Sequence, residues 1–278
     1  MSYIFFGTPE FAAIILEKLI KAGLIPKAVV CNPDRPVDRK KVITPPITKL
    51  LAQKYNIPIL QPEVLTNYQL LITNYQADFF IVAAYAQILP KEILSIPKLG
   101  AIGVHPSLLP KYRGPTPIQT AILNGDEETG VTLYLMDEKI DHGAILANRK
   151  APIANRNYKE LEKGLAELAA TLLIEILPKF IKGEIKPVPQ NEAGATYTKK
   201  FTAQDGFIDA EALRQAENGK NPKSAEEILR RIHALNPEPG TWTLQNGKRI
   251  KLLEARITNN RLVLKTIQPE GKKPTPVS

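Results

Sequence analysis

The sequence predicts an α/β protein in which a doubly wound, mostly parallel sheet is followed by a small second unit. Short apolar segments alternate with amphipathic segments through the first half of the chain, a pattern typical of a parallel sheet with helices on both faces. A stretch rich in Gly and Pro then interrupts the periodicity, and hairpin-like strands follow it. At 278 residues, 44% of them hydrophobic, the chain can bury a substantial core in one large domain or two smaller ones.

Each expected strand of the sheet is a short apolar run. "YIFFG" (3–7) closes with a glycine, and the helix after it is expected to have a capping Thr8, Pro9 at its first helical position and Gly23 at its end. Further strands are expected at 27–32, 57–60, 77–85, 100–105, 130–137 and 144–153, and helices at 46–56, 68–76, 117–125 and 157–182.

The second unit follows an aperiodic segment, residues 183–206, which is expected to be a linker. Residues 224–235 are expected to form a helix, and Asn246-Gly247 the tight turn of a hairpin. With a further strand in 259–269, this pattern suits a small β-barrel or a sheet with one helix.

Charge and cysteine content limit the classes of partner and compartment. The net charge is +9, and residues 199–278 hold 15 basic and 9 acidic side chains, a net charge of +6. Such a basic unit suggests an anionic partner such as nucleic acid, although a solvated basic face explains it equally well. A single cysteine, Cys31, excludes an internal disulfide and fits a reducing cytosol. We find no signal peptide and no membrane-spanning run, and we expect a cytoplasmic monomer.

Several common sites are not supported by the motifs. The sequence contains no GxxxxGK[ST], GxGxxG or GxSxG pattern, which argues against a phosphate-binding loop and a serine hydrolase. The three histidines are far apart and the cysteine is remote from all of them, so we expect no metal site.

The remaining chemistry lies in His105 and Asp141. His105 ends the strand at 100–105, and ligands of open parallel sheets bind at the carboxyl ends of strands. Asp141 follows the strand at 130–137, and a His and a carboxylate from neighbouring strand ends can form a hydrogen-bonded couple. Such a couple suits acyl transfer to an amine, because it can accept the proton of the amine and donate to a developing oxyanion. A buried structural histidine and a turn-capping Asp before Gly143 explain the same residues.

These residues lie within longer stretches that resemble the methionyl-tRNA formyltransferase family. The resemblance is carried in order by "FFGTPEFA" (5–12), "PDRP" (33–36), "AAYAQILP" (83–90), "HPSLLPKYRGPTPIQTAI" (105–122) and "TLYLMDEKIDHGAIL" (132–146). "ATYTKKFTAQDGFID" (195–209) and "LRRIHALNPEPGTWT" (229–243) resemble the linker and the C-terminal domain of that family. SLLPxxRG together with xDxG is specific for folate-dependent formyltransferases as a group.

The resemblance implies transfer of a formyl group from 10-formyltetrahydrofolate to the amino group of methionine on the initiator tRNA. It also implies a Rossmann-like catalytic domain at 1–188, a linker at 189–204 and a shortened, OB-like tRNA-binding domain at 205–278. His105 and Asp141 would be the catalytic pair. The implied folate-binding residues are Tyr85, Gln87, Ile88, Leu89 and Pro90, which line a pterin pocket, and Ser107, Leu108, Leu109 and Pro110, which act through backbone groups. The implied tRNA-binding residues are Arg39, Lys40, Lys41, Lys199, Lys200, Lys248 and Arg249.

One position departs from the family pattern. The family has an Asn two residues before the histidine, and here that position is Gly103. Loss of one oxyanion donor typically costs about 10²–10³-fold in rate. The enzyme is therefore slow or inactive, or another group replaces the Asn. We expect Gly103 and His105 to face the same side of the sheet and the glycine to leave a hollow that holds a water and would accept an Asn.

Two other functions remain open from the sequence. A sugar-nucleotide N-formyltransferase would share the folate motifs, whereas a non-catalytic homologue would keep the fold and bind folate or tRNA. The "GTPEFA" start, the basic loop at 34–46 and the basic second unit favour the tRNA acceptor.

Overall fold

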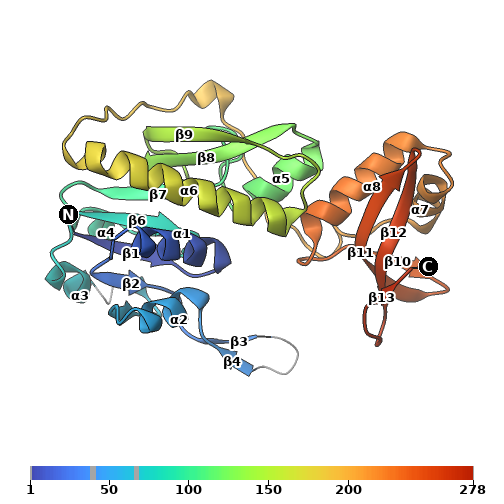
Figure 1. The fold of residues 1–278 in the computed structure, drawn as a ribbon, viewed down its shortest axis with the longest axis horizontal. Coiled ribbons are helices and arrows are strands. Elements are labelled where there is room, and N and C mark those ends of the chain that lie inside the picture. The colour runs from blue at the N-terminus through green and yellow to red at the C-terminus, as the bar shows by residue number, and fades with distance from the viewer. Residues whose placement is uncertain (1, 38–41, 66–68, 278) are drawn as a thin grey trace. The chain divides into compact units, whose positions relative to one another are not determined.

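The computed structural model describes residues 2–37, 42–65 and 69–277 (Figure 1). The chain divides into two compact units. The first comprises Met1–Arg113, Gly130–Ala151 and Glu162–Tyr197, and the second comprises Gly114–Thr129, Pro152–Leu161 and Thr198–Ser278.

A seven-stranded sheet with the strand order β5-β2-β1-β6-β7-β8-β9 is the centre of the first unit. Its first five strands in this order pair in parallel, and β8 pairs antiparallel to β7, which confirms the mostly parallel sheet predicted above. The strands are β1 (Tyr3–Gly7), β2 (Ala28–Val30), β5 (Ile59–Leu60), β6 (Phe79–Ala83), β7 (Ala101–His105), β8 (Glu128–Leu135) and β9 (Ile145–Pro152).

Helices cover both faces of this sheet, because successive strand residues point to opposite sides. Phe79 of β6 contacts Phe180 of the long helix α6, with ring centroids 6.0 Å apart. The next residue, Phe80, belongs to a core cluster on the other face with Ile72 of α3 and Ile93 of α4. The helices are α1 (Glu10–Lys21), α2 (Ile47–Lys54), α3 (Gln69–Asn74), α4 (Lys91–Leu94) and α6 (Tyr158–Ile181).

Two local expectations in the first unit were wrong. Thr8 does not cap α1, whose N-cap residue is Pro9; the Thr8 hydroxyl instead accepts a hydrogen bond from the Asn32 N–H at 3.1 Å. The region expected to be a basic loop contains a hairpin of β3 (Arg35–Val37) and β4 (Val42–Thr44). Its proline, Pro36, is tolerated because a two-stranded ribbon has only edge strands.

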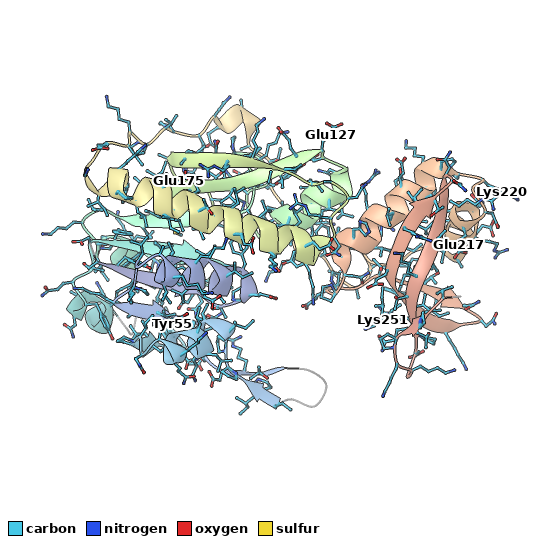
Figure 2. All side chains as sticks on the ribbon, viewed as in Figure 1. Tyr55, Glu127, Glu175, Glu217, Lys220 and Lys251 are labelled. Carbon is cyan, nitrogen blue, oxygen red and sulfur yellow. The ribbon has the colours of Figure 1, made fainter. Side chains whose placement is uncertain are left out.

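Surface ion pairs also connect the elements of the first unit. Glu175 of α6, labelled in Figure 2, accepts two hydrogen bonds from Arg149 of β9, at 3.1 and 2.6 Å. The guanidinium of Arg149 holds the pKa of Glu175 below its usual range.

The second unit contains a four-stranded antiparallel sheet, which confirms the small β unit predicted from the sequence. Asn246 and Gly247 join β10 to β11 with φ angles of 50° and 73°, as the predicted tight turn requires. The helix α7 was not predicted. Asp209 caps it by accepting hydrogen bonds from the Glu211 and Ala212 N–H groups, and an Asp before a helix is a start signal that the sequence contained. The elements are α5 (Pro117–Asn124), α7 (Ala210–Glu217), α8 (Pro222–Leu235), β10 (Trp242–Gln245), β11 (Lys248–Thr258), β12 (Arg261–Pro269) and β13 (Thr275–Pro276).

None of the helices among the described residues has the length and apolar character needed to cross a membrane.

Candidate active site

His105 ends β7 and is buried, with 6% of its surface exposed. Its ring atom Nε2 lies 2.8 Å from the backbone oxygen of Tyr112, which can only accept a hydrogen bond. Nε2 is therefore the protonated nitrogen, and Nδ1 is left facing Asp141, whose Oδ2 is 3.5 Å away. The structure brings the two predicted side chains together, and Nδ1 is the atom that can take up a proton beside a carboxylate.

Asp141 reaches His105 by a different route from the expected one. Because β8 runs antiparallel to β7, its last residue, Leu135, lies opposite Ile102 and not at the His105 end. The loop from 136 to 144 has to fold back by about 10 Å, three residues of strand, to bring the two side chains together.

The backbone of this loop shows how it folds back. Asp141 has a φ of 49°, in the left-handed region that non-glycine residues rarely adopt. A Cβ on Gly143 would overlap the backbone oxygen of Leu135, so only glycine fits where the loop meets the end of the strand.

A buried arginine, which was quoted in the family motif but given no role there, holds the loop in place. Arg113 is 1% exposed and donates to Gln190 Oε1 from Nε and Nη2, at 3.1 and 2.8 Å. The amide of Gln190 donates in turn to the backbone oxygens of Asp141 and Gly143, at 2.9 and 2.8 Å. The predicted linker therefore supports the candidate site at its first residues.

The same guanidinium also binds the residues that follow. Arg113 forms a two-pronged ion pair with Glu192, at 3.0 and 2.6 Å, and this pair holds the pKa of Glu192 below its usual range. Its Nη1 donates to the Tyr197 hydroxyl at 3.1 Å. In the sequence, Arg113 stands out only as a charged residue inside the family motif. The side chains that it contacts lie 77 to 84 residues further along the chain, so the sequence does not show them.

The hollow expected beside Gly103 is not present. Tyr134 of β8 lies opposite Gly103, and a Cβ on that glycine would lie 2.5 Å from Tyr134 Cε1 and 2.8 Å from its hydroxyl. The ring fills the space, so the expectation that an Asn would fit without strain was wrong. The sequence alone could not show this, because the ring comes from a neighbouring strand.

The segment expected to line a pterin pocket has mixed exposure. Tyr85 and Leu89 are buried in the core, whereas Ile88 is 77% exposed and Pro90 precedes α4. Gln87 donates to Asn32 Oδ1 at 2.9 Å. The hydroxyl of Tyr85 has no hydrogen-bond partner among the described residues.

Much of the backbone of the segment 107–110 is hydrogen-bonded to other groups of the protein. Leu109 N–H donates to the Thr132 hydroxyl at 3.0 Å, and that hydroxyl donates to the Ser107 backbone oxygen at 2.7 Å. Ser107 donates from its own hydroxyl to Lys111 O at 2.6 Å. Leu108 is half-buried, and Pro110 accepts at its backbone oxygen from Thr196 N–H at 3.2 Å.

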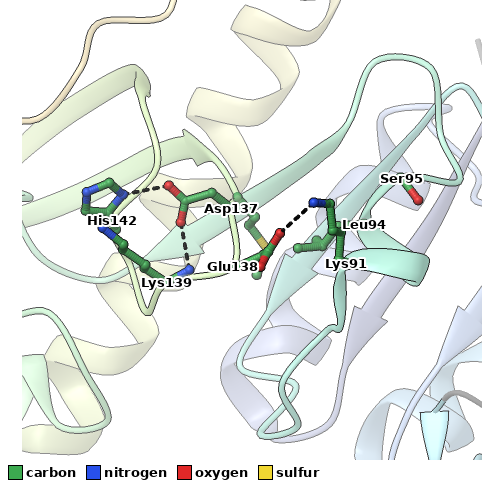
Figure 3. A pocket seen from close by; sticks show the side chains of 8 residues that line it. Lys91, Leu94, Ser95, Asp137, Glu138, Lys139 and His142 are labelled. Atoms are coloured by element: carbon green, nitrogen blue, oxygen red, sulfur yellow. Dashed lines mark hydrogen bonds and ion pairs between the residues drawn. The ribbon is translucent and has the colours of Figure 1, made fainter.

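A pocket of about 560 Å³ lies beside the Asp141 loop (Figure 3). One wall comes from α4 and Ser95, and the other from the loop, with His142 bonded to Asp137 at 2.6 Å and Lys91 paired with Glu138 at 3.4 Å. His105 and Asp141 do not line this pocket. Its lining residues are Lys91, Leu94, Ser95, Met136, Asp137, Glu138, Lys139 and His142.

Four of the predicted tRNA contacts lie on the second unit. Lys199 is exposed and pairs with Asp205 at 3.5 Å, and Lys200 and Lys248 are also exposed. Arg249 stacks its guanidinium on the Trp242 ring, 4.2 Å from the ring centroid. Arg39, Lys40 and Lys41 lie outside the described residues.

Among the residues that the structure describes, no group of three or more His, Cys, Asp or Glu side chains could hold a metal ion.

Comparison with known proteins identifies the family. A family described as formyl transferase matches residues 1–177, and the C-terminal domain of formyl transferases matches residues 222–261. A methionyl-tRNA formyltransferase of Halalkalibacterium halodurans is 42% identical over 255 residues, which cover 91% of this chain and 77% of that protein.

Two solved structures share the fold at lower identity. The methionyl-tRNA formyltransferase from Clostridium thermocellum is 17% identical with a TM-score of 0.62, covering 97% of this chain and 98% of its own. An N-formyltransferase from Helicobacter canadensis, solved with folinic acid and dTDP-3-aminofucose, is 23% identical with a TM-score of 0.63, covering 92% and 88%. Because the first family match spans well over half of the sequence, the chain belongs to the formyl transferase family.

Proposed function

We propose that this chain transfers a formyl group from 10-formyltetrahydrofolate to the α-amine of methionine on the initiator tRNA. The observation that carries the proposal is the contact of buried His105, at the end of β7, with half-buried Asp141, within the part of the chain that matches the formyl transferase family. The methionyl-tRNA formyltransferase of Halalkalibacterium halodurans, 42% identical over 91% of the chain, supports the choice of acceptor.

The pair performs the proton transfers that formyl transfer needs. As the amine nitrogen forms its bond to the formyl carbon, Nδ1 of His105 accepts the proton that the nitrogen loses, and Asp141 stabilises the charged ring. When the bond between the formyl carbon and N10 of the folate breaks, the proton passes to N10. The ring then returns to its neutral form, so one proton has moved from acceptor to donor.

The pocket beside the Asp141 loop supports the choice of donor. This pocket combines apolar Leu94 and Met136 with the ammonium groups of Lys139 and of Lys91, the latter paired with Glu138. A folate carries a flat ring at one end and carboxylates at the other, and such a surface offers contacts to both. We propose that residues 85–90 and 107–110 complete the folate site. We also propose that the catalytic domain ends at residue 188 and the linker at residue 204, as the family pattern implies.

The acceptor accounts for the basic second unit. Lys248, Lys251 (Figure 2) and Arg249 lie on β11, and the stacking of Arg249 on Trp242 provides a cation and an aromatic ring together, as nucleic-acid surfaces often do. We propose that these residues, with Lys199 and Lys200, contact tRNA phosphates. As a translation-initiation enzyme, the protein would act in the cytoplasm.

Salt dependence tests the tRNA surface. With contacts mainly to phosphates, affinity for initiator tRNA falls roughly 10²-fold between 50 and 200 mM salt, measured by filter binding. The double variant Lys248→Gln and Lys251→Gln lowers both affinity and the salt slope, whereas Lys54→Gln, an exposed lysine in the first unit, changes neither. Equal affinity at both salt concentrations would refute the phosphate contacts.

The choice of acceptor has a direct assay. Purified protein is incubated with 10-formyltetrahydrofolate and either methionyl-initiator tRNA or an amino-sugar nucleotide, and formylated products are detected by mass spectrometry. We expect formyl-methionyl-tRNA. Formylation of the sugar nucleotide alone would replace the proposed acceptor, and no product with either would support a non-catalytic homologue.

The catalytic pair is tested in the same assay. His105→Ala and Asp141→Asn each lower kcat by at least about 10²-fold while the proteins keep their folded circular-dichroism spectra. The control is His233→Gln on α8 in the second unit, which leaves kcat unchanged. A His105→Ala protein that loses only thermal stability would show that the histidine is structural.

A further inference from the structure

Tyr134 and Gly103 form one structural feature beside the proposed catalytic pair. The two residues lie opposite each other on β8 and β7, and the Tyr134 side chain is 4% exposed. Its hydroxyl donates to Asp141 Oδ1 at 2.7 Å, while His105 Nδ1 faces Asp141 Oδ2 at 3.5 Å. The carboxylate is therefore approached on one oxygen by the phenol and on the other by the imidazole.

We infer that Tyr134 is a positioning residue for Asp141, and that glycine at 103 is required to admit its ring. This inference rests on the formyl transfer proposed above. Any side chain at 103 would begin within 2.5 Å of Tyr134 Cε1, so a larger residue there requires the tyrosine ring to leave its present position. The Tyr134 hydroxyl lies 2.8 Å from the position that a Cβ of residue 103 would occupy. The polar group at this place therefore belongs to β8, whereas an Asn at position 103 would have supplied it from β7.

The hydrogen bond has a specific task because of the loop that carries Asp141. Gln190 holds the backbone of Asp141, whose φ is 49°, but it does not hold the carboxylate. The phenol selects the side-chain rotamer that keeps Oδ2 toward His105. Burial, then the charge of Asp141, raise the pKa of Tyr134 well above its usual range, so the hydroxyl stays protonated and able to donate.

Tyr134→Phe separates the hydroxyl from the ring. We expect kcat for formyl transfer to fall about tenfold, with KM for both substrates within twofold of the wild type, because the lost bond orients a group and does not contact either substrate. The matched control is Tyr3→Phe. Tyr3 lies on β1 and is 1% exposed, and its hydroxyl donates to Leu24 O at 2.7 Å and not to Asp141. A merely structural hydroxyl would affect both variants alike, lowering Tm without changing kcat.

Substitution of the glycine tests the coupling of the two positions. Gly103→Asn displaces the Tyr134 ring and lowers kcat, the reverse of what an empty hollow would allow. Adding Tyr134→Ala makes room for the amide, so the double variant is expected to be more active than Gly103→Asn alone. A double variant whose losses simply multiply would contradict the coupling.

A readout that needs no acceptor distinguishes this inference from the proposed function. The chain has three histidines, so ¹⁵N-histidine NMR resolves each ring. In Tyr134→Phe we expect the His105 signals to move and those of His142 and His233 to stay. Movement of His105 in a protein that does not formylate methionyl-tRNA would refute the proposed acceptor and support the inference. An unchanged His105 spectrum, or a kcat within twofold of the wild type, would overturn the inference alone.

Discussion

Replacement of Arg113 by Met removes the group that holds Gln190 in place, and Gln190 in turn contacts the loop that carries Asp141. Methionine fills most of the volume and leaves no charge in a site where the arginine is 1% exposed. The hydrogen bonds that are lost include two to Gln190 at 3.1 and 2.8 Å, two to Glu192 at 3.0 and 2.6 Å, and one to Tyr197 at 3.1 Å.

The size of the effect follows from which partners remain buried. Breaking a buried ion pair costs about 3–5 kcal/mol when a charge is left without a partner. Here the buried charge itself is removed, and the Glu192 side chain is 57% exposed and regains water. We therefore expect a loss of about 3 kcal/mol in the free energy of unfolding, mostly from Gln190, and a fall in Tm of about 6–10 °C. Because Gln190 orients the Asp141 and Gly143 carbonyl groups, kcat falls about tenfold as well.

Urea unfolding and formyl-transfer kinetics measure the two effects. Arg149→Met is the matched control, because Arg149 makes the same two-pronged contact with Glu175 but is 37% exposed. We expect that variant to lose less than about 1 kcal/mol, as exposed ion pairs do, with unchanged kcat. If Arg113→Met and Arg149→Met lose the same stability, burial does not set the strength of the Arg113 contacts. If Arg113→Met keeps the wild-type kcat, Gln190 orients the loop without it.

Two further predictions concern the loop and the second unit. Gly143→Ala lowers kcat by about 10²-fold or more, since the added Cβ meets the Leu135 backbone oxygen and moves the loop. Gly194→Ala is the control and leaves kcat unchanged, because the nearest atom to its added Cβ is Pro110 Cγ at 3.5 Å. Equal activity of the two variants would disprove the steric argument. Burial lowers the pKa of His233, so the unfolded state binds more protons and stability is lost as pH falls below the ordinary value of 6.5, by at most about 1.4 kcal/mol per pH unit. Unfolding followed through the fluorescence of the single tryptophan, Trp242, shows this loss, and His233→Gln reduces it; identical pH dependence in the variant would show that another group is responsible.

Local patterns in the sequence determined most of the fold. The apolar run at 100–105 predicted a strand ending at His105, and Asn246-Gly247 predicted the turn of the β10–β11 hairpin. Alternation of strands and helices predicted the sheet with both faces covered. These features depend on the preferences of a few adjacent residues, and such preferences can be read from the sequence. The pairing of Arg35–Val37 with Val42–Thr44 was missed because Pro36 favours a loop locally, whereas pairing between the two segments stabilises strands.

The site was determined only in part by the sequence. The motif named His105 and Asp141 as partners, but the antiparallel direction of β8, which makes the loop fold back, depends on how distant strands pair. Tyr134 occupies the space at Gly103 from the neighbouring strand, and Arg113 reaches Gln190 across 77 residues. Contacts of this kind depend on the packing of side chains that are far apart in the sequence. Only the tertiary structure decided them, because the same residues in another register would face other neighbours.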